Sequence, residues 1–395
     1  MSTRHEGYVA LLRTPGVPRI VLPSVIARLP IGMTAVLLIL LVQQGTGSYR
    51  TAGLAMAVNS LAFAATAPWF GRLADRGHAA AVILITGCAH PVALIGLLLA
   101  VHVSAPDWAV LAGAAAAGGI CPPVAAVTRA LWPRLVDEDM RPTAYGLEAV
   151  LAELTYVLGP MVAGIVLAVA GASAGLLVAA AAVLAGSVGL ARARPVREFR
   201  AAPATGPRRH VLASPALRAV LLVTTVTSVA FGILEVAVPA FAVEHGSPAA
   251  GGILVALWST ASVIGGLLYV RRRWKSPLTR QFAVLTGANA VSFALLALAD
   301  EPWQLGVLLV LGGVLLAPAA AVEYALVSHA ADPSAATQAF TWFGTAAYIG
   351  SAVGGALGGA LVAPLGLTMV FLAAAACGLL GGVCAWRVAT LLRGV

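Results

Sequence analysis

Charge is scarce in this chain. Only 24 of the 395 residues are Lys or Arg and 15 are Asp or Glu, so charged residues make up 10% of the chain and hydrophobic residues 60%. A soluble globular domain carries about 25% charged residues. A water-soluble fold could not bury so much apolar surface, and we therefore infer that the solvent of this chain is a lipid bilayer.

Cysteines and catalytic motifs are also few. We interpret the four cysteines as small packing residues, because they lie in apolar stretches and have no metal-ligand spacing with histidines. The sequence has no phosphate-binding glycine loop, no His-Glu zinc motif and no loop with paired catalytic carboxylates. We expect no enzyme activity, no cofactor and no metal. The net charge of +9 does not indicate nucleic-acid binding, because the arginines border apolar stretches and are placed to meet anionic lipid headgroups.

Long apolar runs fill the rest of the chain. About 20 apolar residues suffice to cross a bilayer, and they must be helical because lipid offers the backbone no hydrogen-bond partners. The sequence predicts an all-α integral membrane protein with twelve membrane-spanning helices. We expect them near residues 18–44, 50–71, 79–102, 106–132, 142–171, 173–192, 215–243, 248–270, 278–299, 303–330, 335–364 and 366–392.

Positive charge lies on one side of this arrangement. All but two of the 24 Lys and Arg fall in or beside the segments that would share a side with both termini; Arg50 would lie opposite, and Arg28 inside a helix. An excess of Lys and Arg marks cytoplasmic loops. We expect a multi-pass protein of the cell (plasma) membrane with both termini in the cytoplasm.

The longest connection divides the chain into two halves. Residues 194–214 are rich in Arg and Pro, which predicts a basic cytoplasmic linker between a bundle of six helices at 1–193 and another at 215–395. Parallel halves of six helices that share a central site are typical of one large class of secondary transporters.

The two halves also look like an internal repeat. Gly118-Gly119 has a counterpart in Gly312-Gly313, and the same offset places Glu323 opposite Arg129. A separate glycine pattern aligns Gly159 with Gly350 and Gly164 with Gly355.

A glycine-rich turn follows the second predicted helix. It reads Gly71-Arg72-Leu73-Ala74-Asp75-Arg76-Gly77, and it resembles the cytoplasmic motif of the major facilitator superfamily, although its second glycine comes one position early. The resemblance extends along essentially the whole chain. It implies that Asp75 caps the N-terminus of the eleventh helix, where the helix dipole favours a carboxylate. It also implies that Arg76 pairs with a nearby acid, and that the two residues together latch the cytoplasmic side.

The fifth predicted helix carries a second motif. Gly146, Thr155, Gly159-Pro160 and Gly164 resemble the antiporter motif of the drug exporters in this superfamily, with small residues in place of two glycines. Small residues let helix backbones approach closely, and proline permits a bend. The resemblance implies proton-coupled export.

Ionisable residues inside the membrane are costly and are therefore candidates for function. Glu153 and Glu235 are our candidate proton and substrate carboxylates, and we expect Arg28 to pair with Glu153. The alternative is that this pair only holds two helices together. Glu323, Tyr156 and Asn59 are further candidates for lining a cavity.

Three charged residues lie nearer the cytoplasmic helix ends. Glu148 shares a helix stripe with Thr155 and Gly159 and points away from Glu153, so we interpret it as a structural or gating partner of Arg76 or Arg129. Arg129 and Glu323 would form a salt bridge that closes the cytoplasmic side.

The sequence thus favours a monomeric secondary transporter, with protons and a small molecule as its partners. The expected activity is export of a small organic compound in exchange for protons, and the excess of buried acids favours a cationic or neutral substrate. One alternative is an importer or uniporter of a nutrient such as a sugar or an amino acid. A second is a membrane receptor or assembly partner that transports nothing.

Overall fold

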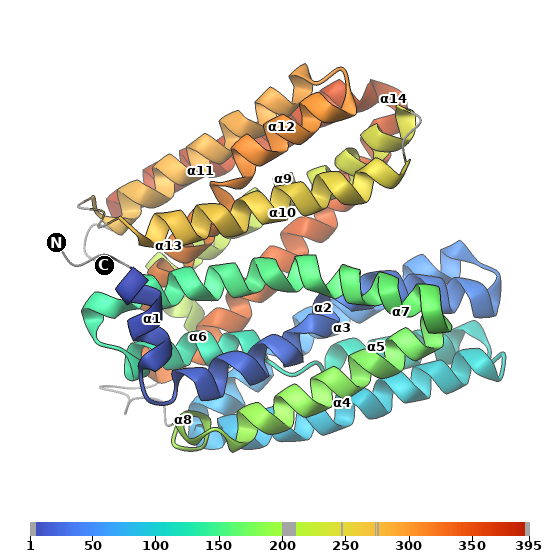
Figure 1. Cartoon of the computed structure of the whole chain (residues 1–395), viewed down its shortest axis with the longest axis horizontal. Coiled ribbons are helices and arrows are strands. Elements are labelled where there is room, and N and C mark those ends of the chain that lie inside the picture. The colour runs from blue at the N-terminus through green and yellow to red at the C-terminus, as the bar shows by residue number, and fades with distance from the viewer. Residues whose placement is uncertain (1–4, 200–210, 246–247, 273, 275, 392–395) are drawn as a thin grey trace.

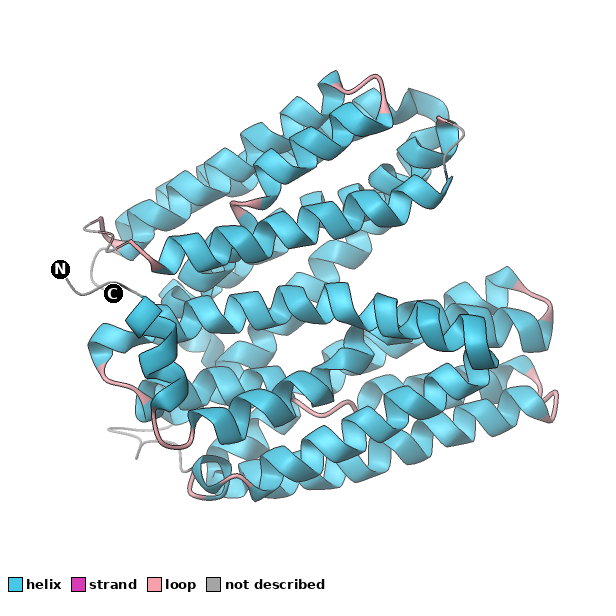
Figure 2. Cartoon of the chain, viewed as in Figure 1, coloured by secondary structure: helices cyan, strands magenta, loops and turns pink. Residues whose placement is uncertain are grey.

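The computed structural model describes residues 5–199, 211–245, 248–272, 274 and 276–391. Throughout this part of the chain the regular secondary structure is helical, and loops are short (Figure 2). Ten of the described helical stretches are long and apolar enough to cross a membrane. The chain is therefore an all-α membrane protein, as its composition predicts.

The first half begins with a short helix and ends in a very long one. Its elements are α1 (His5–Arg13), α2 (Val17–Thr46), α3 (Tyr49–Leu73), η1 (Ala74–His78), α4 (Ala79–His102), α5 (Asp107–Gly119), α6 (Val124–Leu135), η2 (Glu138–Met140), α7 (Arg141–Arg192) and α8 (Arg194–Arg197).

The second half has a similar succession of helices. Its elements are η3 (Val211–Ala213), α9 (Pro215–Glu244), α10 (Pro248–Val270), α11 (Leu278–Leu295), η4 (Leu296–Leu298), α12 (Pro302–Gly313), α13 (Leu316–Ala330), η5 (Pro333–Ala335) and α14 (Ala336–Leu391). Of the predicted linker at 194–214, residues 200–210 lie outside the described part.

Most predicted helices agree with the observed ones to within a few residues, but two of them are divided. The predicted helix at 106–132 is broken between α5 and α6 at Cys121–Pro123, where two consecutive prolines supply no backbone N–H. The predicted helix at 303–330 is broken between α12 and α13 at Val314–Leu315. The two breaks occupy matching places in the two halves.

Two long helices each reverse direction at a glycine. Gly171 in α7 has φ 80° and ψ 177°, and Gly366 in α14 has φ 73° and ψ 165°. These are left-handed backbone conformations that glycine adopts without steric cost. Each long helix is thus two helices, as the sequence predicts, joined by a sharp turn.

The helices gather in two groups (Figure 1). Helices α2 to α7, coloured blue to green, form one group, and α9 to α14, coloured yellow to red, form the other. Within the groups the most extensive contacts join α2 to α7 and α9 to α14. The groups approach each other at the end formed by α1, η1, η2 and α8, which we call the basic end, and their ribbons diverge toward the opposite end.

Glycines mark the closest helix crossings, and they reveal the repeat. A Cβ on Gly159 would lie 2.7 Å from the Cα of Gly32, so α7 crosses α2 at backbone contact. In the second group a Cβ on Gly354 would lie 3.0 Å from the Cα of Gly232, where α14 crosses α9. The structural counterpart of Gly159 is therefore Gly354, and the predicted match to Gly350 is wrong.

The same correction applies to the broken helices. A Cβ on Gly118 would meet the backbone of Asn59, and a Cβ on Gly313 would meet the backbone of Trp258. Gly118 and Gly313 are thus equivalent and 195 residues apart. The predicted repeat was one residue too short in this region, because a Gly-Gly pair in each half allows two alignments.

Candidate functional site

A carboxylate joins the two groups at the basic end. Asp75, in the η1 turn, accepts hydrogen bonds from the backbone N–H of Thr337 at 2.9 Å and of Gln338 at 2.8 Å. Both amides belong to the first turn of α14, where the helix dipole favours negative charge. Beside this contact, a Cβ on Gly71 would lie 2.9 Å from the Cα of Gln338. The helix cap implied by the sequence motif is therefore present.

The basic residue of the same motif has a different place from the expected one. Arg76 is exposed and forms no ion pair with any described residue. Asp75 instead interacts electrostatically with Arg134 of α6, whose guanidinium lies 4.9 Å from the ring centroid of Phe199. The expected partnership of Arg76 with an acid is thus wrong, because its long exposed side chain points into solvent.

Three charged residues form a buried cluster, which we call the charge triad: Arg28 of α2, Arg129 of α6 and Glu148 of α7. Oε1 of Glu148 lies 2.7 Å from Nη1 of Arg28 and 3.4 Å from Nε of Arg129. Its other oxygen accepts from Nε1 of Trp132 at 3.2 Å, and Arg28 also donates to the hydroxyl of Thr128. The predicted pairing of Glu148 with Arg129 is confirmed.

The prediction that Arg28 pairs with Glu153 is wrong. Arg28 lies deeper along α2 than Glu148 lies along α7, and both helices begin at the basic end. Helical side chains tilt toward the N-terminus of their helix, and arginine is long. The guanidinium of Arg28 therefore reaches back to the level of Glu148, which the position of its Cα does not reveal.

Arg129 connects the charge triad to the second group. Its Nη2 donates to the hydroxyl of Tyr324 at 3.0 Å, and its guanidinium lies 4.1 Å from the centroid of that ring. The expected salt bridge from Arg129 to Glu323 is absent from the described contacts. Tyr324 stands 195 residues after Arg129, so the corrected repeat makes these two residues equivalent, and the one-residue alignment error accounts for the wrong partner.

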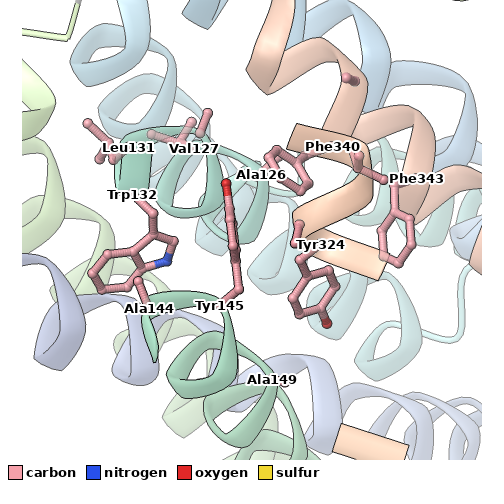
Figure 3. Packing of buried hydrophobic residues seen from close by; sticks show 14 of the residues in the cluster. Ala126, Val127, Leu131, Trp132, Ala144, Tyr145, Ala149, Tyr324, Phe340 and Phe343 are labelled. Atoms are coloured by element: carbon pink, nitrogen blue, oxygen red, sulfur yellow. The ribbon is translucent and has the colours of Figure 1, made fainter. Parts of the chain in front are cut away.

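Aromatic side chains surround this connection (Figure 3). Tyr145 of α7 lies between Trp132 and Phe340, and its ring centroid is 6.4 Å from that of Phe340 in α14. Tyr324 meets Phe343 edge to face at 5.5 Å. Together with the Asp75 cap, these contacts close the basic end between the two groups.

Three other carboxylates lie farther from the basic end, and each faces a hydroxyl group. Glu235 of α9 accepts from Ser351 at 2.9 Å, and Glu323 of α13 accepts from Thr224 at 3.3 Å. Glu153 of α7 interacts with the hydroxyl of Ser262 in α10, across the boundary between the groups. None of the three forms an ion pair within the described residues.

Tyr156 lies among these carboxylates. It follows Glu153 by nearly one helical turn and interacts electrostatically with Glu153, Glu235 and Tyr324, although 52% of its surface is exposed. A residue that is half exposed while it faces both groups lines a solvent-accessible space between them. Asn59 is instead half-buried and donates to the carbonyl of Ala114 at 3.0 Å, which is a contact within one group.

Polar side chains from other helices form hydrogen bonds with backbone groups beside the two helix breaks, between α5 and α6 and between α12 and α13. The hydroxyl of Ser262 accepts from the N–H of Ala317 in the first turn of α13 at 3.0 Å. Nδ1 of His90 lies 2.8 Å from the carbonyl oxygen of Ala117, near the end of α5. Ser262 therefore contacts both Glu153 and the N-terminus of a half-helix.

The hydroxyl partners were not predicted from the sequence. Ser262, Thr224 and Ser351 are single hydroxyl residues in apolar helices, where such residues also serve as helix-packing contacts. The glycines of the α7 motif differ in their surroundings. Gly159 packs on α2, whereas a Cβ on Gly164 would meet no atom within 4 Å.

Comparisons with known proteins agree with this architecture. The human organic anion transporter MFSD10 (TETRAN) superposes with a TM-score of 0.74 over 94% of this chain and 99% of that one, at 16% identity. A bacterial homologue of the iron transporter ferroportin, in an outward-facing state, superposes with a TM-score of 0.78 over 94% and 99%, at 13% identity. No curated protein matches the chain in sequence.

A sequence profile gives the family assignment. The profile of the Major Facilitator Superfamily matches residues 21–298 and, in a second alignment, residues 220–393. These two matches span both helix groups, the η1 turn with its capping carboxylate and the charge triad. With the repeat of two helix groups and the superposed transporters, they establish that the chain is a member of the Major Facilitator Superfamily.

Proposed function

We propose that this protein exports a small organic compound in exchange for protons, and that the basic end faces the cytoplasm. Membership of the superfamily supports membrane transport by alternating access. In the proposed cycle, the two helix groups rock about the space beside Tyr156. The contacts of Asp75, Arg129 and Tyr324 hold the cytoplasmic side closed in the present state.

One observation carries the proposal for proton coupling. Glu153, Glu235 and Glu323 each lie beside a hydroxyl group and form no ion pair within the described residues, although Glu323 also interacts electrostatically with Arg129. A hydroxyl can donate to a carboxylate or accept from a carboxylic acid, so each site accommodates both protonation states. A lone charge inside a membrane is costly, so a carboxylate without an ion pair there is a candidate for the exchange of a proton.

Glu153 is our leading candidate for the proton carrier. It is the carboxylate whose hydroxyl partner belongs to the opposite helix group, so its protonation state bears on a contact between the groups. Through Ser262 it is also linked to the first turn of α13, the half-helix that carries Glu323 and Tyr324. Movement of this half-helix and exchange of a proton are therefore mechanically connected.

The space beside Tyr156 favours a cationic or neutral substrate. Carboxylates bind cations, and the faces of tyrosine rings attract them. The superposed transporters do not decide the charge, because one is described as an organic anion transporter and the other as a relative of an iron transporter. At 16% and 13% identity they share the fold.

The test is compound-dependent proton movement in proteoliposomes. Wild type, Glu153→Gln and Glu235→Gln would be compared with Glu138→Gln, whose side chain is 84% exposed in the η2 turn, as the matched control. Cationic, neutral and anionic compounds would be added while internal pH is recorded. We expect flux in wild type and in the control, and loss of flux in Glu153→Gln.

Efflux from preloaded vesicles determines the direction of transport. Acceleration of efflux by an inward proton gradient would support export. Equilibration of labelled solute without any proton movement, in wild type as in both variants, would refute proton coupling and favour a nutrient uniporter. Flux that survives in Glu153→Gln but is lost in Glu235→Gln would move the carrier to α9.

A further inference from the structure

The basic end is closed by two equivalent contacts between the helix groups. In the first seal, Gly71 of α3 packs on Gln338 and Thr341 of α14. In the second seal, α10 packs on α7: a Cβ on Gly266 would lie 2.8 Å from Cγ2 of Val150, and a Cβ on Gly146 would meet the side chain of Val270. The contact of Val270 with Gly146 matches that of Gly71 with Thr341, because Val270 stands 199 residues after Gly71, the spacing that also separates Asn59 from Trp258.

The two seals differ in what secures them. The first has Asp75, which binds the N-terminus of α14. Helix α10 ends at Val270, and the 199-residue spacing places Trp274 opposite Asp75. The turn that follows, Arg271–Pro277, contains no acid, and α7 itself begins with Arg141. No carboxylate from this turn is available to cap α7.

The N-terminal helix α1 lies where the missing cap would be. The hydroxyl of Tyr8 donates to the carbonyl of Gly266 at 3.4 Å, and it would lie 3.4 Å from a Cβ on Gly146. A Cβ on Gly7 would lie 3.9 Å from the methyl group of Thr143. Thr143 stands 195 positions before Gln338, one of the two residues that Asp75 binds. Tyr8 therefore bridges the two helix groups at the second seal.

The remaining side chains hold α1 in this position. Leu11 is fully buried and belongs to the core cluster of the basic end, whereas Val9 and Leu12 are each 42% exposed. A short helix with one buried face and exposed apolar residues on the other suits the membrane interface. The helix is thus anchored to the protein by Leu11 and Tyr8 and placed to contact lipid with its outer face.

We propose that α1 is a strap that holds the second seal closed, in the role that Asp75 fills at the first. Because Tyr8 contacts Gly266 of one group and the α7 N-terminus of the other, separation of the groups at the basic end must break its contacts. The strap therefore stabilises the state closed at the basic end. This inference rests on alternating access alone and on neither the substrate nor the proton.

The strap can be tested by the accessibility of the second seal. Val150, which is 5% exposed, would be replaced by cysteine in the full-length protein after substitution of the four native cysteines, and the protein reconstituted in nanodiscs. The rate of maleimide labelling at Val150→Cys reports opening of the seal. Tyr8→Phe removes one hydrogen bond and Tyr8→Ala also removes the packed ring, while Leu12→Ala on the outer face is the matched control.

We expect labelling to rise about 2-fold in Tyr8→Phe and about 10-fold in Tyr8→Ala, following the net free energy of one hydrogen bond and of the lost packing. Leu12→Ala should label at the wild-type rate. Asp75→Asn serves as the positive control for opening. Labelling that is unchanged in both Tyr8 variants while Asp75→Asn accelerates it would overturn the strap, and so would equal acceleration by Leu12→Ala. Because the assay uses neither substrate nor proton gradient, its outcome is independent of the proposed export activity.

Discussion

The charge triad contains more positive than negative charge, and this imbalance predicts how substitutions in it change the stability of the protein. Arg28 and Arg129 carry two positive charges against the one negative charge of Glu148, and the three are 2%, 8% and 1% exposed. Glu148→Gln keeps the shape of the side chain but leaves two buried guanidinium groups without a counter-ion. Because an uncompensated buried charge is so costly, we expect a loss of about 3–5 kcal/mol in the free energy of unfolding.

The partner substitution should cost less. Arg28→Gln leaves Glu148 with Arg129 and with the indole of Trp132, so we expect a loss of about 1.5–3 kcal/mol, the value of a hydrogen bond to a charged group. The double variant Arg28→Gln/Glu148→Gln restores the original total charge. It should therefore be less destabilised than the sum of the single variants by about 1–3 kcal/mol.

Equilibrium unfolding by SDS titration in mixed micelles would measure all four proteins of this cycle. Glu138→Gln, on the exposed η2 turn, is the control and should remain within about 0.5 kcal/mol of wild type. If the double variant equals the sum of the singles to within about 0.5 kcal/mol, the three charges are not coupled and the reasoning fails. It also fails if Glu148→Gln is less damaging than Arg28→Gln.

Two further predictions concern the closed end and the helix crossings. Asp75→Asn loses one hydrogen bond and the attraction of a charge to the α14 dipole, which together contribute about 0.5–1.4 kcal/mol. A cysteine at Thr341 should therefore react with maleimide about 2- to 10-fold faster. An unchanged rate would show that Asp75 does not hold the first seal. Gly159→Ala should lower stability in the SDS titration by about 1–3 kcal/mol, because its Cβ would lie 2.7 Å from the Cα of Gly32. Gly164→Ala, which has open space, should be neutral or slightly stabilising, and equal losses in the two variants would contradict the crossing.

The helices could be predicted from the sequence because lipid imposes a simple requirement on a chain. Each crossing needs a long apolar run with an internally bonded backbone, and both properties are visible in the residues. The break at Cys121–Pro123 could have been predicted from its paired prolines. The break at Val314–Leu315 has no proline between its flanking helices, but Pro318 supplies no N–H to the carbonyl of Val314, and the Ser262 hydroxyl from another helix accepts from the N–H of Ala317.

The partners of charged residues were harder to predict. Helix α7 carries two acids, Glu148 and Glu153, that could pair with Arg28. Which of them does so depends on the length and tilt of the Arg28 side chain as well as on the depth of its Cα in the membrane. Arg129 was assigned to Glu323 rather than Tyr324 because neighbouring residues on a helix differ by about 100° and the repeat was aligned one residue short. The cap formed by Asp75 was expected, because the motif fixes both the acid and the helix end that receives it.

The unlike chemistry of the two seals has a consequence for temperature. The first seal is held by hydrogen bonds from two backbone amides to Asp75, and the second by the close fit of Val150 and Val270 against glycines. Separation of the second seal exposes apolar surface to water, and the free-energy cost of that exposure falls on cooling. A polar contact has no such dependence. The two sides of the same closure therefore weaken under different conditions: at low temperature the α7–α10 side becomes the weaker one, and the protein relies on Asp75 to stay closed.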